Sequence, residues 1–304
     1  MSPVSPVHAG PQVGVIGLFV LATAIWSSTW LVITFQLGHV APEASVAYRF
    51  ALAALVLAAW CIATRRPLRF PLRVHGWLAL QGTLYFGLNY VALYKAEQYI
   101  ASGLVAVVFS LIVFSNLIGA RLAFGTPVRR HELIAAALGV FGVTLMFLPE
   151  LAPAHPAAQF GLGLAYAGGS TLVTTGGTLV SMRLQRARLP ILSTTTWGMA
   201  YGAAVAAIVA TVSGIAWSFE PTLRYVAALV YLAVFGSVVA FTAYLLLLKR
   251  IGPTSSSYVG VATPVVAMLL STIAEGYRWE PLAAFGIVLA VAGNVIVLRG
   301  VRRS

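Results

Sequence analysis

The chain contains no aspartate, and its other catalytic or metal-binding residue types are few and scattered. All seven glutamates and all five histidines fall at the ends of hydrophobic segments or in the connections between them. No HExxH motif, no cluster of His and Glu and no P-loop is present, so the sequence predicts neither a metal centre nor direct use of ATP. Ser110 and Ser115 have no histidine at their depth to act as a base, which argues against a membrane-embedded lipid-modifying enzyme.

Cysteine is almost absent as well, and the basic residues form no continuous stripe. The single cysteine, Cys61, excludes an intrachain disulfide. The formal net charge of +12 comes from short connections, so we expect contact with anionic lipid and no binding of nucleic acid. Residues 1–11 contain no Lys or Arg, which predicts that the first hydrophobic segment is retained rather than cleaved as a signal peptide.

Long hydrophobic runs fill the rest of the chain. Hydrophobic residues make up 60% of the 304 residues and charged residues only 9%, whereas about a quarter of a soluble domain is charged. Runs of roughly 17–25 apolar residues can cross a bilayer as helices. Such runs occupy residues 12–35, 43–63, 74–96, 100–122, 131–148, 160–181, 193–213, 224–247, 254–273 and 281–299. The sequence therefore predicts an all-α integral membrane protein with ten transmembrane helices.

The basic residues predict the orientation of these helices. Fifteen of the nineteen Lys and Arg residues fall in every second connection or at the C-terminus, and the exceptions are Arg49, Lys95, Arg224 and Arg278. Because positively charged residues resist translocation, we expect the connections rich in Lys and Arg to lie in the cytoplasm together with both termini. An odd number of segments would put the basic C-terminus on the wrong side.

The connection around residues 149–159 divides the chain into two halves, 1–150 and 151–304. Each half holds an odd number of segments, five, so the second half enters the membrane from the opposite side. Inverted repeats of this kind are common in transporters and place the substrate site at the repeat interface. The two halves share little sequence, so the prediction rests on segment spacing, and ten unrelated helices remain the alternative.

Several motifs also carry a family resemblance. The first segment reads ATAIWSSTWLVI (Ala22–Ile33), and Trp26 within it is followed by Arg49 in the second segment. In the second half, Pro264 in the ninth segment is followed by Glu275. Together with length and segment order, this pattern resembles the EamA family of the drug/metabolite transporter superfamily over nearly the whole chain.

The resemblance implies an inner-membrane exporter of small metabolites, with exporters of aromatic and other neutral amino acids as the nearest relatives. One departure concerns the first half, where Val113 and Phe124 stand in place of the proline and glutamate that the family pattern repeats. This departure argues against two symmetric proline gates. Proton-coupled export of drugs or other metabolites in the same fold is the alternative function.

Polar residues at helical spacing predict which faces line a pathway, because a lipid-facing helix is apolar all round. The sixth segment carries a threonine stripe: Thr171, Thr174, Thr175 and Thr178. Glycines beside the stripe suggest bending points: Gly168, Gly169, Gly176 and Gly177. Threonine hydroxyls can also bond to their own helix, so a packed helix is the alternative interpretation.

The third segment carries the aromatic counterpart of this stripe. Its candidate substrate-binding residues are Tyr85, Asn89, Tyr90, Tyr94, Lys95 and Glu97. Lys95 and Glu97 lie near the outer end, where they could bind the carboxylate and amine of an amino acid or could extend to water. Further candidates are Trp26, Ser27, Trp30, Arg49, Tyr244 and Tyr258, with Pro264 as a kink.

These residues predict alternating access around a central cavity lined by the first, third, fourth, sixth, eighth and ninth segments. Ion-coupled pumps need an anionic group deep in the membrane, and no glutamate of this chain lies at such a depth. Transport is therefore expected to be facilitative, or coupled through an end-placed group such as Glu97. No cofactor is expected, the partners are a small-molecule substrate and the lipid bilayer, and a single chain suffices to form the pathway.

Overall fold

The computed structural model describes residues 14–125, 127–148, 157–256 and 258–302, and the regular structure within these ranges is entirely helical. By length and composition, five stretches can cross a membrane: Val15–Thr34, Pro42–Ala63, Ser102–Phe124, Ile191–Val212 and Leu223–Tyr244. Shorter apolar helices add Tyr258–Ala274 and Pro281–Ile296. These observations confirm an all-helical protein with several apolar spans, and the ten-helix inverted layout stays a prediction.

A helix occupies each hydrophobic segment expected from the sequence. The first half contains α1 (Val15–Thr34), α2 (Pro42–Ala63), α3 (Leu72–Gln81), η1 (Gly82–Leu88), α4 (Asn89–Ala96), α5 (Ser102–Phe109), α6 (Ile112–Phe124) and α7 (Arg130–Phe147). The second half contains α8 (Ala157–Arg186), α9 (Ile191–Val212), α10 (Leu223–Val230), η3 (Tyr231–Val239), α11 (Ala240–Ser256), α12 (Tyr258–Ala274) and α13 (Pro281–Arg302).

Local sequence sets several of the helix ends. α2 and α13 begin at Pro42 and Pro281, whose fixed φ and missing N–H suit a first helical position. α6 ends at Gly125, which adopts φ 69°, a left-handed conformation that costs glycine little. The Glu132 side chain accepts a hydrogen bond at 2.7 Å from the Arg129 backbone N–H and caps the start of α7.

Two stretches of π-helix interrupt the bundle. η1 continues α3 into α4 without a break, and η3 does the same between α10 and α11. The Ser237 hydroxyl donates at 2.9 Å to the Leu232 carbonyl, five residues earlier. Each π-helical stretch lies in the third long helix of its half, and π-helical turns are frequent at functional sites.

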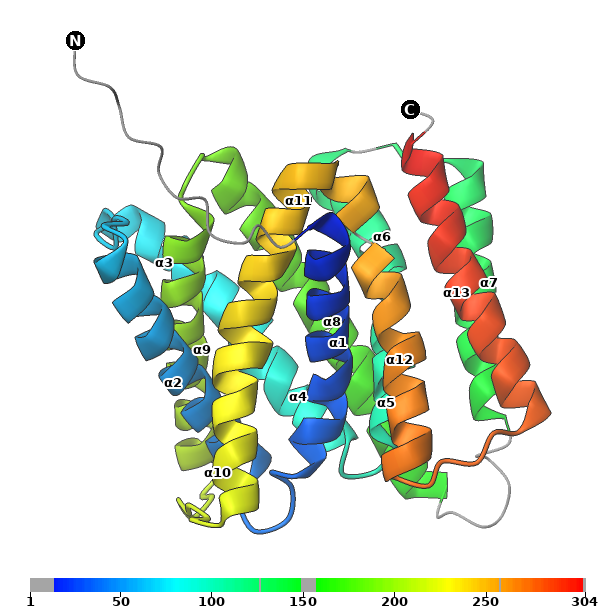
Figure 1. The fold of residues 1–304 in the computed structure, drawn as a ribbon, viewed down its shortest axis with the longest axis horizontal. Helices are drawn as coiled ribbons and strands as arrows, with labels where there is room; N and C mark the ends of the chain where they lie inside the picture. Colours follow the sequence, from blue (N-terminus) through cyan, green and yellow to red (C-terminus); the bar gives the residue numbers. More distant parts are fainter. Residues whose placement is uncertain (1–13, 126, 149–156, 257, 303–304) are drawn as a thin grey trace.

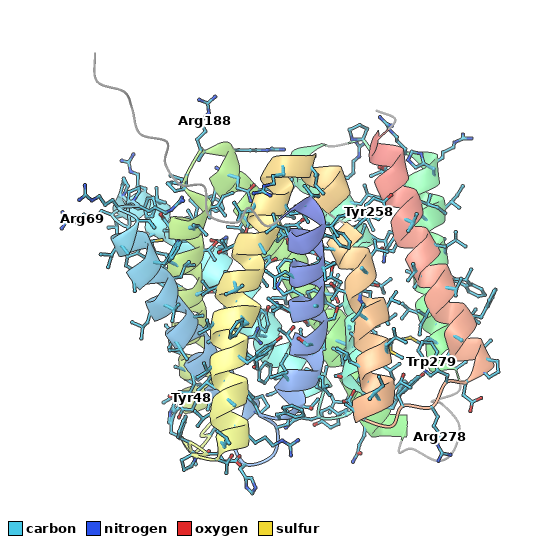
Figure 2. The ribbon with its side chains drawn as sticks, viewed as in Figure 1. Tyr48, Arg69, Arg188, Tyr258, Arg278 and Trp279 are labelled. Carbon is cyan, nitrogen blue, oxygen red and sulfur yellow. The ribbon has the colours of Figure 1, made fainter. Side chains whose placement is uncertain are left out.

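The helices form one bundle and run along a common direction (Figure 1). α1 begins and α13 ends at the same face, which we call the terminal face, and the connections from α1 to α2 and from α12 to α13 lie at the opposite face. Figure 2 shows Arg69 and Arg188 at the terminal face and Arg278 at the opposite face. α13 and α7 pack against each other along one side of the bundle.

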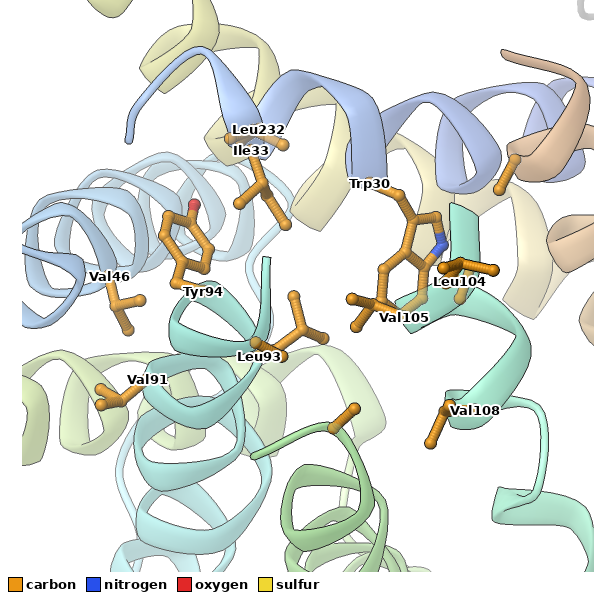
Figure 3. Close-up of a cluster of buried hydrophobic side chains, with 14 of the residues drawn as sticks. Trp30, Ile33, Val46, Val91, Leu93, Tyr94, Leu104, Val105, Val108 and Leu232 are labelled. Atoms are coloured by element: carbon orange, nitrogen blue, oxygen red, sulfur yellow. The ribbon is translucent and has the colours of Figure 1, made fainter. Parts of the chain in front are cut away.

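The main hydrophobic core extends through most of the helices, and Figure 3 shows the part of it between α1, α2, α4 and α5. Trp30 and Ile33 of α1 meet Leu93 and Tyr94 of α4 there, and Val105 of α5 closes the cluster. Trp30 is 8% exposed, and its ring centroid lies 5.4 Å from that of Phe109. Trp30 thus packs in the core.

Small residues allow α9 to approach η1 closely. A Cβ placed on Gly202 would collide with Phe86, and one placed on Gly82 would collide with the Gly198 carbonyl. The Gly198 and Gly202 pair therefore packs backbone against backbone, as small residues do between membrane helices.

Candidate functional site

A cavity of about 270 Å³ opens between α3, η1, α8, α9 and α11. It runs from the terminal face toward the middle of the bundle, because Gln185 and Ile191 lie beside the turn between α8 and α9, whereas Tyr85 lies within η1. The lining residues are Gln81, Tyr85, Phe86, Thr178, Ser181, Met182, Gln185, Ile191, Thr194, Thr195, Phe241 and Tyr244. Both halves of the chain contribute to these walls.

The walls of this cavity are polar but uncharged. Among the residues that the structure describes, the lining contains no Asp, Glu, Lys, Arg or His, whereas it carries amides, hydroxyls and aromatic rings. A ligand with a net charge would lose hydration there without gaining a counter-charge. The cavity is therefore suited to a neutral or zwitterionic molecule with an apolar part.

Gln81 offers an unpaired acceptor in this wall. Its Nε2 donates at 2.7 Å to the Ser181 hydroxyl, which in turn donates at 2.9 Å to the Gly177 carbonyl. This chain of donors assigns the amide orientation and leaves Gln81 Oε1 buried without a hydrogen-bond partner. This oxygen is enclosed within the wall, so it becomes a contact for a substrate donor only if the wall rearranges.

Aromatic side chains form the wall on the α11 side. The Tyr244 ring lies 5.2 Å from the Trp26 ring, and Phe241 lies 5.4 Å from Trp26 on the same side. Trp26 Nε1 donates at 3.3 Å to the Gly236 carbonyl of η3. Trp26 therefore lies between α1 and α11 and backs the cavity wall instead of facing lipid.

The threonine stripe on α8 is mostly satisfied within its own helix. The hydroxyls of Thr171, Thr174, Thr175 and Thr178 donate to the carbonyls of Ala167, Ser170, Thr171 and Thr174, respectively. Thr178 also lines the cavity. The stripe thus combines both interpretations, because its first three members are buried in helix packing and its last member reaches the cavity.

The glycines of α8 fall into two groups. A Cβ on Gly177 would collide with Tyr85, and one on Gly176 would touch Leu84, so this pair lets α8 approach η1. Gly168 and Gly169 have no neighbouring atom within 4 Å of a built Cβ. α8 is an unbroken helix here, and a hinge at these glycines stays a prediction.

Two buried polar contacts hold the cavity helices to their neighbours. Asn89 Nδ2 donates at 3.1 Å to the Tyr85 carbonyl, and its Oδ1 accepts at 2.6 Å from the Ser170 hydroxyl of α8. The Ser27 hydroxyl of α1 donates at 3.1 Å to the Thr263 carbonyl of α12, next to Pro264. Asn89 and Ser27 therefore position helices, and neither is among the cavity-lining residues.

At the opposite face the predicted cations are engaged by the protein. Arg49 is 1% exposed, and its guanidinium lies 4.7 Å from the Tyr90 ring centroid and 5.2 Å from that of Phe50. Arg49 Nη1 donates at 3.4 Å to the Tyr94 hydroxyl, which donates at 2.8 Å to Gln36 Oε1. A charge buried in this way needs such partners, and here aromatic faces and a hydroxyl supply them.

Lys95 forms an ion pair across this face. Its Nζ lies 2.6 Å from Glu43 Oε1, and the Lys95 and Glu43 side chains are 31% and 2% exposed, respectively. Glu43 lies in the first turn of α2, where the helix dipole favours a negative charge. The pair ties the end of α4 to the start of α2.

Glu97 follows the last residue of α4 and is buried near this pair. It is 8% exposed, and neither of its carboxylate oxygens has a hydrogen-bond partner in the described structure. Glu275, beyond the end of α12, instead accepts hydrogen bonds from the Ser102 backbone N–H at 3.3 Å and the Ser102 hydroxyl at 2.6 Å. Thus Glu275 caps α5, and Glu97 stays unpaired.

The structure separates the predicted site residues into two groups. Tyr85, Thr178 and Tyr244 line the cavity, with Trp26 directly behind it. The residues at or toward the opposite face are Trp30, Arg49, Tyr90, Tyr94, Lys95 and Glu97. Tyr258 is the first residue of α12, outside the lining (Figure 2).

Sequence reasoning missed one wall of the cavity entirely. α9, in the seventh segment, contributes Thr194 and Thr195, and the ends of α3 and α8 contribute Gln81, Ser181 and Gln185. The signal was a run of four hydroxyl residues, Ser193 to Thr196, shortly after Pro190, together with Gln81 inside the third apolar segment and Gln185 just beyond the sixth.

Three known proteins are similar to this chain in sequence. The uncharacterized inner membrane transporter YedA of Escherichia coli (strain K12) is 28% identical over 290 residues, covering 90% of this chain and 89% of YedA. Protein PecM of Dickeya dadantii is 27% identical over 231 residues, covering 73% of this chain and 74% of PecM. Protein PagO of Salmonella typhimurium is 22% identical and covers 92% of this chain and 91% of PagO.

A solved structure and a family profile agree with these relatives. One crystal structure superposes with a TM-score of 0.67 at 20% identity, covering 94% of this chain and 96% of the other, and this likeness bears on the fold alone. The profile of the EamA-like transporter family matches twice, at residues 13–148 and 161–299. This chain therefore belongs to the EamA-like transporter family.

Proposed function

We propose that this membrane transporter is an inner-membrane exporter of small, net-neutral metabolites that works by alternating access. Aromatic and other neutral amino acids are the class that suits its cavity. The observation that carries the proposal is the uncharged cavity between the two halves, with aromatic walls beside unpaired or hydroxyl-bearing polar groups. Each charged group of a zwitterion needs its own partners, and lining residues such as Gln185 and Thr195 can supply acceptors for the ammonium and donors for the carboxylate.

The state of the two faces supports alternating access. The cavity reaches the terminal face, whereas the opposite face carries the contacts of Lys95 with Glu43 and of Tyr94 with Gln36. Arg69 and Arg188 lie at the terminal face (Figure 2), which supports a cytoplasmic location for both termini. The structure then corresponds to a state open to the cytoplasm and closed to the outside.

Two features support a pair of five-helix inverted repeats at 1–150 and 151–304. The family profile matches once in each half, and each half carries one π-helical stretch, η1 and η3, in its third long helix. Ten spans with five in each half bring both termini to one side. One chain forms the whole cavity, which supports a monomeric transporter.

Transport is facilitative in this proposal, because the cavity lining contains no titratable carboxylate to exchange a proton for substrate. Proton-coupled export of drugs or other metabolites is the alternative. No arrangement among the described residues favours an enzyme: Ser110 and Ser115 donate to the carbonyls of Val107 and Leu111 and form no contact with a histidine.

The experiment is uptake of radiolabelled phenylalanine, tyrosine and leucine into proteoliposomes, with and without an imposed pH gradient. Flux that ignores the gradient and is competed by neutral amino acids, but not by an organic cation, supports the proposal. Tyr244→Ala should raise the half-saturation concentration by about tenfold, equivalent to about 1.4 kcal/mol of lost contact. The matched control Tyr99→Ala, at the opposite face and 38% exposed, should leave it unchanged. Flux that depends on the gradient would favour the proton-coupled alternative.

A further inference from the structure

The buried Glu97 side chain has no part in the cavity described above. It follows α4 at the closed face, and neither oxygen has a hydrogen-bond partner or forms an ion pair among the described residues. A carboxylate removed from water without compensation costs several kcal/mol in a protein, so such groups are neutralised or paired. The buried Glu97 carboxyl must therefore be either neutralised by a proton or paired with a cation.

The charged groups around Glu97 do not supply the pairing. Arg49 on α2 is the nearby cation, but its guanidinium is held over Tyr90 and bonded to Tyr94, with its Nε buried and unpaired. Glu275, after α12, is the nearby anion and is already bound by Ser102. Among the other cations at this face, Lys95 is paired with Glu43, Arg224 lies over the Phe35 ring, and Arg278 is exposed.

Burial and the neighbouring carboxylate of Glu275 both raise the pKa of Glu97. Burial, the larger cause, raises the pKa of Glu97 well above its usual value, the negative charge of Glu275 raises it further, and Arg49 offsets part of the rise. Glu275 accepts hydrogen bonds at the N-terminus of α5. The closed arrangement therefore favours the protonated form of Glu97 more than water does.

We propose that Glu97 is a proton-binding site of the closed outer face, so that protons on that side of the membrane favour closure of the transporter. When this face opens, water reaches Glu97 and the proton leaves for the outside solution. When it closes, a proton must be taken up. The inference rests on the proposed function only in treating this face as a gate.

The same geometry argues that the proton is not carried across the membrane. Glu97 is not among the residues that line the cavity, which reaches the terminal face from Gln81 and Tyr85. Uptake and release thus occur on one side, and the proton regulates the gate without driving transport. Export by this mechanism slows as the outer solution becomes acidic.

The direction of the pH effect follows from proton linkage. In the open face Glu97 is hydrated and its pKa falls back toward that of an ordinary glutamate, whereas burial keeps the pKa higher in the closed face. Between these two values the closed face binds more protons, so closure is fully supported at low pH and loses support as pH rises. The ratio of open to closed protein should rise by about tenfold per pH unit within this window and stay level above it.

Two measurements test this inference without any substrate. First, infrared difference spectra of the purified full chain against Glu97→Gln at neutral pH should show the C=O stretch of a protonated carboxylic acid. The matched control Glu220→Gln, a partly exposed glutamate that accepts a hydrogen bond from Thr222, should show no such band. Absence of the band in the Glu97 spectrum means that Glu97 is ionised and overturns the proposal. If Glu97→Gln does not fold, the pH titration of the band in the parent protein gives the same answer.

Second, the gate can be followed by cysteine labelling. Cys61 is fully buried, so a Cys61→Ala background with Val105→Cys provides one reporter in the closed core at this face (Figure 3). The labelling rate in detergent or lipid should rise with pH in the parent background and be independent of pH in Glu97→Gln. If the labelling rate still changes with pH in Glu97→Gln, another group causes the pH dependence and the proposed role of Glu97 is refuted. Neither readout depends on whether amino acids are the substrate.

Discussion

Tyr94 is the centre of the polar contacts at the opposite face, which the proposed mechanism treats as the closed outer face. Its ring is fully buried, its hydroxyl donates to Gln36 at 2.8 Å, and the same hydroxyl accepts from Arg49 at 3.4 Å. Tyr94→Phe removes both contacts and keeps the ring. Gln36 Oε1 is then left without this donor, while its Nε2 already has no partner. The Tyr94→Phe substitution alters a site that is buried in the closed state and hydrated in the proposed open state.

The expected magnitude follows from the two lost contacts. A neutral hydrogen bond contributes about 1 kcal/mol net, and a stranded buried acceptor costs about 1–3 kcal/mol. The Arg49 contact is long, so it adds little. We therefore expect the closed face to lose about 2 kcal/mol relative to the open face, which raises the open fraction by about thirtyfold.

The assay is the labelling rate of Val105→Cys in the Cys61→Ala background, measured at one fixed pH. Tyr94→Phe should be labelled about thirtyfold faster than its parent. The matched control is Tyr99→Phe, since Tyr99 is 38% exposed at the same end of α4 and stacks on Tyr166 through its ring. Equal labelling of Tyr94→Phe and Tyr99→Phe would refute the view that the Tyr94 hydroxyl holds this face closed.

Three further predictions concern the cavity, the helix packing and the ion pair. Gln81→Leu removes an unpaired acceptor from the cavity wall, so it should raise the half-saturation concentration for a zwitterionic substrate by about tenfold in a flux assay. Gly202→Ala places a Cβ against Phe86, and thermal unfolding in detergent should show a loss of about 1–3 kcal/mol. Lys95→Met leaves Glu43 buried and unpaired, so it should destabilise the fold by about 1–3 kcal/mol, whereas the double variant with Glu43→Gln should recover most of this loss.

Each of these predictions has a control within the chain. Gln98→Leu, exposed at the opposite face, should leave the half-saturation concentration unchanged, and an equal effect would show that the Gln81 result is not local. Gly168→Ala has open space for its Cβ and should not destabilise the fold. A loss of flux in Gly168→Ala without a loss of stability would instead support a hinge in α8. For the ion pair, a double variant as unstable as Lys95→Met would contradict the assigned cause.

How far the sequence alone reached can be judged from the helices and the aromatic residues. Each helix among the described residues overlaps a segment found by hydropathy, because only helices satisfy their backbone within an apolar segment. Hydropathy did not reveal η1 and η3, because a π-helical stretch depends on how neighbouring helices pack and not on local composition. The sequence predicted one aromatic face on the third segment, but Tyr85 lies on the cavity and Tyr94 beside Arg49, about two and a half turns away along one continuous helical stretch.

The amino-acid sequence by itself determined the class of protein and its family, because segment length, scarce charge and recurring motifs are local properties. Only the tertiary structure decided which polar groups face a cavity, which are satisfied by their own helix and which are buried without a partner. Thr171 and Thr178 share one stripe, yet one packs and the other lines the cavity. The sequence singled out Glu97 as an end-placed candidate for substrate contact or coupling, but only the packed helices show that it is buried without a partner. Burial and pairing depend on neighbours distant in the chain, and these are fixed only when the helices pack.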